Sequence, residues 1–175
     1  KSFGRILIFQ IIMLGAAGMI QEATAEDALR VSRHPDWYDL TPYLSWIEDS
    51  VGTLTYDQIR QDDTKHHWLP VTKSTVNFGY TASAFWFKFR LINTEPESLN
   101  QMMEIAYPVL DHIDVYQSNP DGTVIHTPMG DKQPFPLRPV QARNFLFPTH
   151  LEANTPADIY LRIQTSSSMQ VPLRL

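Results

Sequence analysis

Two arginines, Arg138 and Arg143, are the residues of this sequence best suited to bind a small ligand. Arg138 follows the run PFPL at 134–137, whose prolines have a fixed φ angle and therefore limit the freedom of the backbone. A guanidinium on a rigid loop suits recognition of a carboxylate or of sugar hydroxyls, because little entropy is lost on binding. The alternative is a structural arginine that ties the loop to a carboxylate elsewhere in the fold, for which Asp111 is the natural partner.

Aromatic side chains offer a different kind of site, a platform on which sugar rings stack. The candidates are Trp68, Trp86, Tyr107 and Tyr116. Trp86 lies in a predicted strand, on the opposite face from its neighbours Phe85 and Phe87, because successive strand residues point to opposite sides. It therefore either fills a second packed layer or lines a concave sheet. Core packing is the favoured alternative, since aromatic residues in strands are usually buried.

Catalytic and metal-binding chemistry finds little support. In a strand His112 and Asp114 share a face while Asp111 sits at the entry turn, which favours structural or solvent-facing roles for all three. His66 and His67 are adjacent, so in a strand they point to opposite faces and do not readily chelate one ion. The triple-serine run lacks the G-x-S-x-G elbow of a nucleophile, and no phosphate-binding glycine loop is present. We expect no enzyme activity in this chain, no metal and no cofactor.

Composition and charge restrict the class of protein further. A length of 175 residues favours one domain, and 43% hydrophobic with 19% charged residues is typical of a globular chain. The formal net charge of −5 provides no general attraction to nucleic acid, so no nucleic-acid partner is expected. The absence of cysteine excludes a disulfide framework, thiolate zinc sites and cysteine nucleophiles.

Residues 1–25 have the pattern of an export signal. Lys1 and Arg5 both precede the nearly continuous apolar run 6–14. The segment 23–25 (Ala-Thr-Ala) has the small residues that a signal peptidase needs. The apolar run is short for a membrane span, which needs about 20 residues. We expect cleavage after this segment, the alternative being an uncleaved signal anchor, and either outcome places the remainder outside the cytoplasm.

Alternating apolar and polar residues predict the elements that position these side chains. Along residues 84–93 the apolar positions Phe85, Phe87, Phe89 and Leu91 share one face, as in a strand with one buried side. Shorter runs of the same kind occur at 103–107, 113–115, 145–147, 159–163 and 171–175. The Asp-Gly pair at 121–122 predicts a hairpin, and Thr55 with Gln58 forms a capping-box pattern that predicts one short helix at 55–61.

These patterns predict an all-β fold, an antiparallel sandwich or jelly roll with an N-terminal signal helix and one short helix. We assign residues 26–36 to a loosely held polar lead-in and residues 37–175 to the sandwich domain. The sequence begins without methionine and ends inside an apparent strand, so we expect a fragment of a longer protein, truncated before a transmembrane region.

Several segments in this order resemble a known family. They are LTPYL at 40–44, FWFKF at 85–89, YPVLDHIDVY at 107–116, and Gly130 followed by PFPLR at 134–138. Over residues 37–175 the chain resembles the 7TMR-DISM extracellular domain, type 2, the periplasmic input domain of bacterial receptors with seven transmembrane helices. Members of that family often have arginine where Lys88 stands. If this position contacts the ligand, lysine offers a point charge in place of a bidentate guanidinium.

The resemblance implies a jelly roll similar to carbohydrate-binding modules, followed in the same chain by transmembrane helices and by a histidine kinase or cyclic-di-GMP enzyme. It implies a ligand that is a sugar, an amino acid or a small carboxylate, and a periplasmic location as part of an inner-membrane protein. The domain would act either alone or as a homodimer. The candidate ligand-binding residues are Arg138, Arg143, Asp111, Tyr107, Trp68 and Lys88.

Two other functions are weaker. A free-standing secreted carbohydrate-binding or adhesive module would share the export signal and the sandwich, but a further soluble domain would follow it. A secreted hydrolase ranks last, because no pair of carboxylates is placed by the sequence across a cleft.

Overall fold

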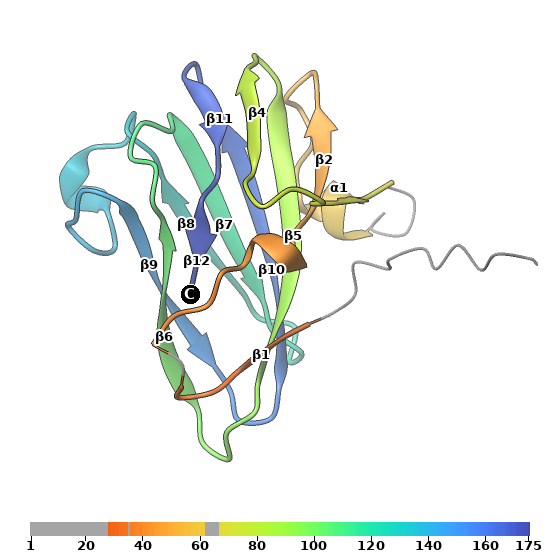
Figure 1. Ribbon diagram of the computed structural model, residues 1–175, viewed down its shortest axis with the longest axis vertical. Helices are drawn as coiled ribbons and strands as arrows, with labels where there is room; N and C mark the ends of the chain where they lie inside the picture. The colour runs from red at the N-terminus through yellow and green to blue at the C-terminus, as the bar shows by residue number, and fades with distance from the viewer. Residues whose placement is uncertain (1–27, 35, 62–66) are drawn as a thin grey trace, which may run out of the picture.

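The computed structural model describes residues 28–34, 36–61 and 67–175, and the expected signal helix lies outside these ranges. Within them the chain forms two packed β-layers (Figure 1). The strands are nearly all antiparallel, which confirms the predicted fold class. No helix in the described ranges is long and apolar enough to span a bilayer.

The larger layer is a sheet with the strand order β3-β2-β5-β10-β7-β8, to which β1 adds beside β5. Its strands are β1 (Leu29–Val31), β2 (Ser45–Asp49), β3 (Leu69–Pro70), β5 (Ala84–Asn93), β7 (His112–Ser118), β8 (Val124–Met129) and β10 (Pro156–Gln164). The β7–β8 pair is the predicted hairpin, and Gly122 in its turn has a φ of +87°, which suits glycine. This sheet carries the candidate site described below.

The second layer consists of two shorter sheets, β12-β6-β9 and β11-β4. Its strands are β4 (Asn77–Tyr80), β6 (Leu99–Ile105), β9 (Phe145–Leu151), β11 (Ser168–Gln170) and β12 (Leu173–Arg174). The chain between β11 and β12 joins the two sheets, because the Val171 amide donates to the Val76 carbonyl and the Pro172 carbonyl accepts from the Ala106 amide.

The main core lies between the two layers and follows the predicted alternation. Phe85, Phe87, Phe89 and Leu91 of β5 all point into it, together with Phe145 and Phe147 of β9 and Ile159, Leu161 and Ile163 of β10. Burial of these side chains, worth about 1.5–3 kcal/mol each, is the main driving force that closes the sandwich.

The lead-in is held more firmly than its polar composition suggested. Leu29 and Val31 are buried in the main core, on either side of the exposed Arg30. They form β1, which pairs with Leu91–Asn93 of β5 in the parallel direction. β1 thus adds one parallel pair to an otherwise antiparallel sandwich, because two alternating apolar residues in the lead-in are enough to extend the sheet.

Three short helical elements complete the described fold: η1 (Thr41–Tyr43), α1 (Tyr56–Gln61) and η2 (Phe135–Leu137). Helix α1 is the predicted helix, and its capping box is formed. The Thr55 amide donates to Gln58 Oε1 over 2.9 Å, and the Gln58 amide lies 3.4 Å from Thr55 Oγ1. Figure 1 shows α1 beside the large sheet, on the side away from the second layer.

Candidate functional site

The outer face of the large sheet, opposite the main core, carries a second cluster of aromatic side chains. We call it the aromatic face and define it by Tyr56, Trp68, Trp86, Tyr116, His126 and Tyr160. Helix α1 contributes Tyr56 and the buried Ile59, while Trp68 precedes β3. The remaining four come from β5, β7, β8 and β10, on the side of each strand that faces away from the main core.

Strand register places these side chains in two rows that cross four strands. In one row Lys88 is opposite Tyr160, Tyr160 is opposite Tyr116, and Tyr116 is opposite His126. In the next row the residues are Trp86, Arg162, Asp114 and Pro128. Side chains directly opposite one another in an antiparallel pair are within contact distance, so each row forms a continuous strip.

Three rings form a stack across this face. The Tyr116 ring lies between Tyr56 and His126, at 4.4 Å from each ring centroid and with interplanar angles of 9° and 7°. Trp86 stacks on Tyr116 at 6.0 Å, and Trp68 meets the edge of Tyr160 at 6.4 Å. Each such aromatic pair contributes roughly 0.5–1.5 kcal/mol beyond the area it buries, so the stack holds α1 against the sheet.

The loop before α1 is fixed by the buried carboxylate of Asp49 at the end of β2. Its oxygens accept hydrogen bonds from the amides of Gly52 and Leu54, each over 2.8 Å. Arg162 holds the same loop from the sheet, because its Nη2 donates to the Gly52 carbonyl over 3.0 Å and to Gln164 Oε1 over 3.1 Å. The position of α1 over the aromatic face therefore follows from polar contacts as well as from ring packing.

Asp114 is the carboxylate of this face. Its Oδ1 lies 2.9 Å from His126 Nε2, and its Oδ2 lies 4.0 Å from Arg162 Nη1. Desolvation by burial raises the pKa of the neighbouring Tyr116 phenol, and the negative charge of Asp114 adds to this shift while Arg162 opposes it. The phenol therefore stays protonated at neutral pH and is available as a hydrogen-bond donor.

Three polar atoms of the aromatic face are buried without a hydrogen-bond partner in the described part of the chain: Tyr56 OH, Trp68 Nε1 and Trp86 Nε1. A buried polar group left unpaired costs about 1–3 kcal/mol. An indole nitrogen is a donor only, so a matching ligand or water must supply acceptor oxygens. Stacked rings, unpaired donors and a carboxylate beside an arginine together suit a small, oxygen-rich molecule.

Two of the six predicted ligand residues lie together on this face. The Lys88 ammonium is 4.7 Å from the ring centroid of Trp68, within the range of a cation–π contact. Three of the four aromatic residues proposed as a platform, Trp68, Trp86 and Tyr116, lie on this face, whereas Tyr107 packs against the main core.

Arg138 stabilises its own loop. Its guanidinium lies over the rings of Phe135 and Phe145, at 5.0 and 4.6 Å, and its Nη1 donates to the carbonyls of Ala142 and Arg143 over 2.9 and 3.1 Å. The suggested pairing with Asp111 was wrong, because Nη1 donates to backbone carbonyls near in sequence and Asp111 is bonded to Ser166. The Arg138 Nε is buried and has no hydrogen-bond partner in the described part of the chain. The Arg143 residue is exposed and contributes its carbonyl to this contact.

Asp111 lies at one end of the sandwich and is paired with Ser166. Its Oδ2 accepts from the Ser166 hydroxyl over 2.7 Å and from the Ser166 amide over 2.8 Å, and these bonds lower the pKa of the carboxyl. Gly130 makes this arrangement sterically feasible, because a Cβ at that position would lie 2.1 Å from the Asp111 carbonyl oxygen. An open hollow of about 670 Å³ beside Asp111 is also lined by His112 and by the exposed Tyr80.

In the described ranges no group of three or more His, Cys, Asp or Glu side chains is placed to hold an ion. Of the histidine pair, His67 is exposed and His66 lies outside the described residues.

Sequence reasoning missed three residues of the aromatic face, Tyr56, His126 and Tyr160, and also Arg162 beside them. Tyr56 directly follows the predicted cap at Thr55, so its position in the helix could be predicted from the sequence. The ring that it stacks on could not be predicted. The other three face outward on strands whose neighbours are set by the strand order. Their alternation with buried residues indicates that they face outward, but it does not predict which strands are neighbours in the sheet.

Comparison with known proteins agrees with this architecture. A search of the curated proteins found no match. A family model described as 7TMR-DISM extracellular 2 matches residues 41–175, more than three quarters of the chain, and this confirms the resemblance seen in the sequence. The chain therefore belongs to the 7TMR-DISM extracellular 2 family, whose members are extracytoplasmic sensor domains of membrane receptors.

Proposed function

We propose that this domain is the periplasmic, non-catalytic input domain of a bacterial inner-membrane receptor, and that it senses a saccharide, amino acid or small carboxylate bound on the aromatic face. The observation that carries the proposal is the set of three buried donors on this face that have no partner among the described residues. Transmembrane helices of the same chain would pass the signal to a histidine kinase or a cyclic-di-GMP enzyme.

The chemistry of the face supports an oxygen-rich ligand. Sugar hydroxyls and carboxylates can supply the acceptors that the described part of the chain does not offer to the indole N–H groups of Trp68 and Trp86. Trp68 offers partly exposed ring surface, while Asp114 and Arg162 offer an acceptor and a donor at the rim. A few convergent polar groups in an aromatic setting are typical of small-molecule sites.

Burial of Trp86 gives the site a way to report occupancy. The residue is 0% exposed beneath the ring stack, so a ligand reaches its indole nitrogen only when α1 and Tyr56 shift. A ligand that binds the shifted arrangement better than the closed one changes the balance between the two, and this difference in affinity is what a receptor can transmit.

A thermal-shift screen of the purified chain against saccharides, amino acids and dicarboxylates tests the proposal. A ligand at 100 times its dissociation constant adds about 2.7 kcal/mol of stability, or a shift of roughly 5–10 °C for a chain of this size. Trp68→Ala should abolish the shift, whereas Trp37→Ala, which removes a tryptophan that is 61% exposed outside the aromatic face, should keep it. A panel without a hit, or a hit whose shift survives Trp68→Ala, would contradict the proposal.

A further inference from the structure

The segment between β8 and β9, residues 131–143, projects away from the two layers (Figure 1, cyan to light blue). We call it the projecting loop. Its backbone is fixed by three prolines, by the short helix η2, and by hydrogen bonds from the Arg138 guanidinium to the carbonyls of Ala142 and Arg143. Side chains on this loop are therefore held in defined positions outside the core.

Two large apolar side chains of the projecting loop face solvent. Phe135 is 48% exposed and Leu137 is 69% exposed, and neither belongs to the main core or to the aromatic face. Side chains of these two types are usually buried. Their exposure side by side on one rigid turn indicates a surface that a partner covers.

The same loop carries positive charge that the described part of the chain does not neutralise. Lys132, Arg138 and Arg143 stand against one acidic residue, Asp131, which gives the loop a net charge of +2 in a chain of formal net charge −5. None of the three cations forms an ion pair within the described ranges, although Lys132 acts on Asp111 at longer range. The charge of the loop is therefore complementary to an anionic partner.

Arg138 gives a second, independent indication of such a partner. Its Nη1 donates to two carbonyls, but its Nε is buried and has no hydrogen-bond partner among the described residues. A guanidinium only donates, so an acceptor oxygen must satisfy this N–H group. The half-exposed Phe135 ring lies 5.0 Å from the guanidinium carbon. Transfer of this ring into an apolar phase would open the guanidinium to an anionic oxygen.

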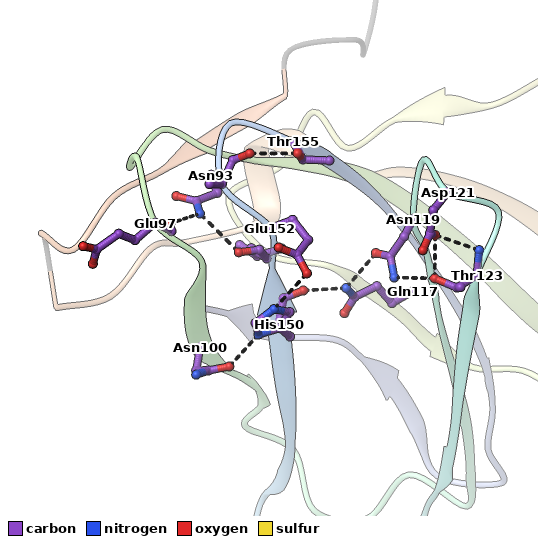
Figure 2. Close-up of polar contacts among 12 residues, drawn as sticks. Asn93, Glu97, Asn100, Gln117, Asn119, Asp121, Thr123, His150, Glu152 and Thr155 are labelled. Carbon is purple, nitrogen blue, oxygen red and sulfur yellow. Dashed lines mark hydrogen bonds and ion pairs between the residues drawn. The ribbon is translucent and has the colours of Figure 1, made fainter.

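The opposite end of the sandwich has the reverse character (Figure 2). Its three turns carry the exposed carboxylates of Glu97, Asp121 and Glu152. Arg33 pairs with Glu97, and His150 Nε2 lies 3.3 Å from Glu152 Oε1. β8 leads from the turn at this acidic end to the projecting loop, so the two regions are separated by the length of that strand. An anionic surface would repel the acidic end and attract the loop.

We propose that the projecting loop docks on an anionic lipid surface. Phe135 and Leu137 enter the apolar phase, and Lys132, Arg138 and Arg143 contact lipid phosphates. Apolar area together with flanking cations is what gives peripheral segments their affinity for anionic membranes. A second copy of the chain fits less well, because a two-fold contact through this loop brings like charges together.

This inference goes beyond ligand binding on the aromatic face, with which the projecting loop shares no residue. It rests on the proposed function only for the membrane to which the domain is attached. Docking of the loop would fix the orientation of the sandwich relative to that membrane.

Single-cysteine labelling of the full chain tests the proposal, because the chain has no cysteine of its own. Leu137→Cys and Ile125→Cys each replace an exposed apolar residue, the second on β8 near the acidic end. Each variant carries a bimane fluorophore and is mixed with vesicles of phosphatidylglycerol whose acyl chains are brominated. We expect quenching of the Leu137→Cys label and little quenching of the Ile125→Cys label. Bromine quenches only at the labelled site, so binding of the predicted export signal to the vesicle does not produce this difference.

Lipid charge and loop charge are then varied separately. Brominated phosphatidylcholine alone should quench the Leu137→Cys label only weakly. Addition of Lys132→Gln/Arg143→Gln should lower the docking constant on phosphatidylglycerol by roughly thirtyfold, because each cation near an anionic surface contributes about fivefold. The matched control Arg30→Gln/Lys73→Gln removes the same charge from exposed residues outside the loop and should preserve the quenching.

Three results would overturn the proposal: equal quenching of the two labels, equal quenching on the two lipids, or an equal loss in the two double variants. A change in the Leu137→Cys label that needs no vesicles and grows with protein concentration would also overturn it, since a second copy then covers the loop. These measurements use no ligand of the aromatic face. Their failure therefore leaves the proposed function to its own thermal-shift test.

Discussion

The imidazole ring of His126 lies parallel to the phenol ring of Tyr116, with 4.4 Å between centroids and 7° between planes. His126 is on β8, the edge strand of the large sheet, and Tyr56 of α1 covers the other side of Tyr116. A single tyrosine thus connects a helix to the far edge of the sheet. A change at any one of the three rings therefore alters the packing of the other two.

Replacement of Tyr116 by leucine should therefore destabilise the domain. The change removes three ring contacts, with Tyr56, His126 and Trp86, of roughly 0.5–1.5 kcal/mol each. We therefore expect a loss of about 1.5–4.5 kcal/mol in the free energy of unfolding, measured by urea titration. Tyr80→Leu is the matched control, because Tyr80 is 84% exposed and should change stability by less than about 0.5 kcal/mol. Equal effects of the two changes would show that the stack contributes nothing.

The Asp111 carboxylate should make stability depend on pH. Hydrogen bonds from the Ser166 hydroxyl and amide lower its pKa in the folded protein. The stabilisation is therefore complete above the unfolded value of about 3.9 and is lost as pH falls through the lower, folded value. Asp111→Asn should reduce the free energy of unfolding by about 1 kcal/mol at pH 7, because a charged acceptor is replaced by a neutral one. The difference between variant and parent should shrink below pH 4. A difference that stays constant down to pH 2 would contradict this assignment.

Gly130 should tolerate no side chain. A Cβ there would meet the backbone of Asp111 at 2.1 Å from the carbonyl oxygen and 2.7 Å from the carbonyl carbon. We expect Gly130→Ala to cost more than about 3 kcal/mol in chemical denaturation, since backbone must move. Gly122→Ala is the comparison, because it has a positive φ of 87° but open space around it. It should cost only about 1–2 kcal/mol. A small loss of stability in Gly130→Ala would mean that the backbone at Gly130 and the backbone at Asp111 can move apart at little cost.

Substitutions of Arg138 and Arg143 should have different effects on the free energy of unfolding, measured by chemical denaturation. Arg138→Ala removes two cation–π contacts and two hydrogen bonds to carbonyls, so a loss of about 1–3 kcal/mol is expected. Arg143→Ala removes an exposed side chain and should stay within about 0.5 kcal/mol. If the two substitutions prove equally mild, Arg138 does not fix its loop and is free to serve a ligand.

Local patterns were sufficient to predict much of the fold. The alternation along 84–93 predicted strand β5 and its buried face, the pair Thr55 and Gln58 predicted α1, and the Asp-Gly pair predicted the β7–β8 hairpin. In each case a few adjacent residues determine the conformation. β1 escaped notice because only two apolar residues, Leu29 and Val31, mark it within a polar stretch.

The candidate site was harder to predict because it depends on which strands are neighbours. Lys88 and Tyr160 face each other only because β10 inserts next to β5, and His126 joins them through the register of the β7–β8 pair. Trp68 and Lys88 were recognised by residue type, but their proximity to Tyr160 required the topology. Arg138 bonds to Ala142, four residues away, and Asp111 bonds to Ser166, 55 residues away, so the pair suggested by charge does not form.

Nuclear magnetic resonance of the four indole N–H groups tests the central claim, ligand binding on the aromatic face, most directly. On titration with a ligand from the thermal-shift screen, the Trp68 and Trp86 resonances should move as their unpaired donors gain acceptors, while the resonance of Trp37 stays in place. A saturable ligand that leaves both Trp68 and Trp86 unshifted would contradict the claim and place the sensor site elsewhere on the domain.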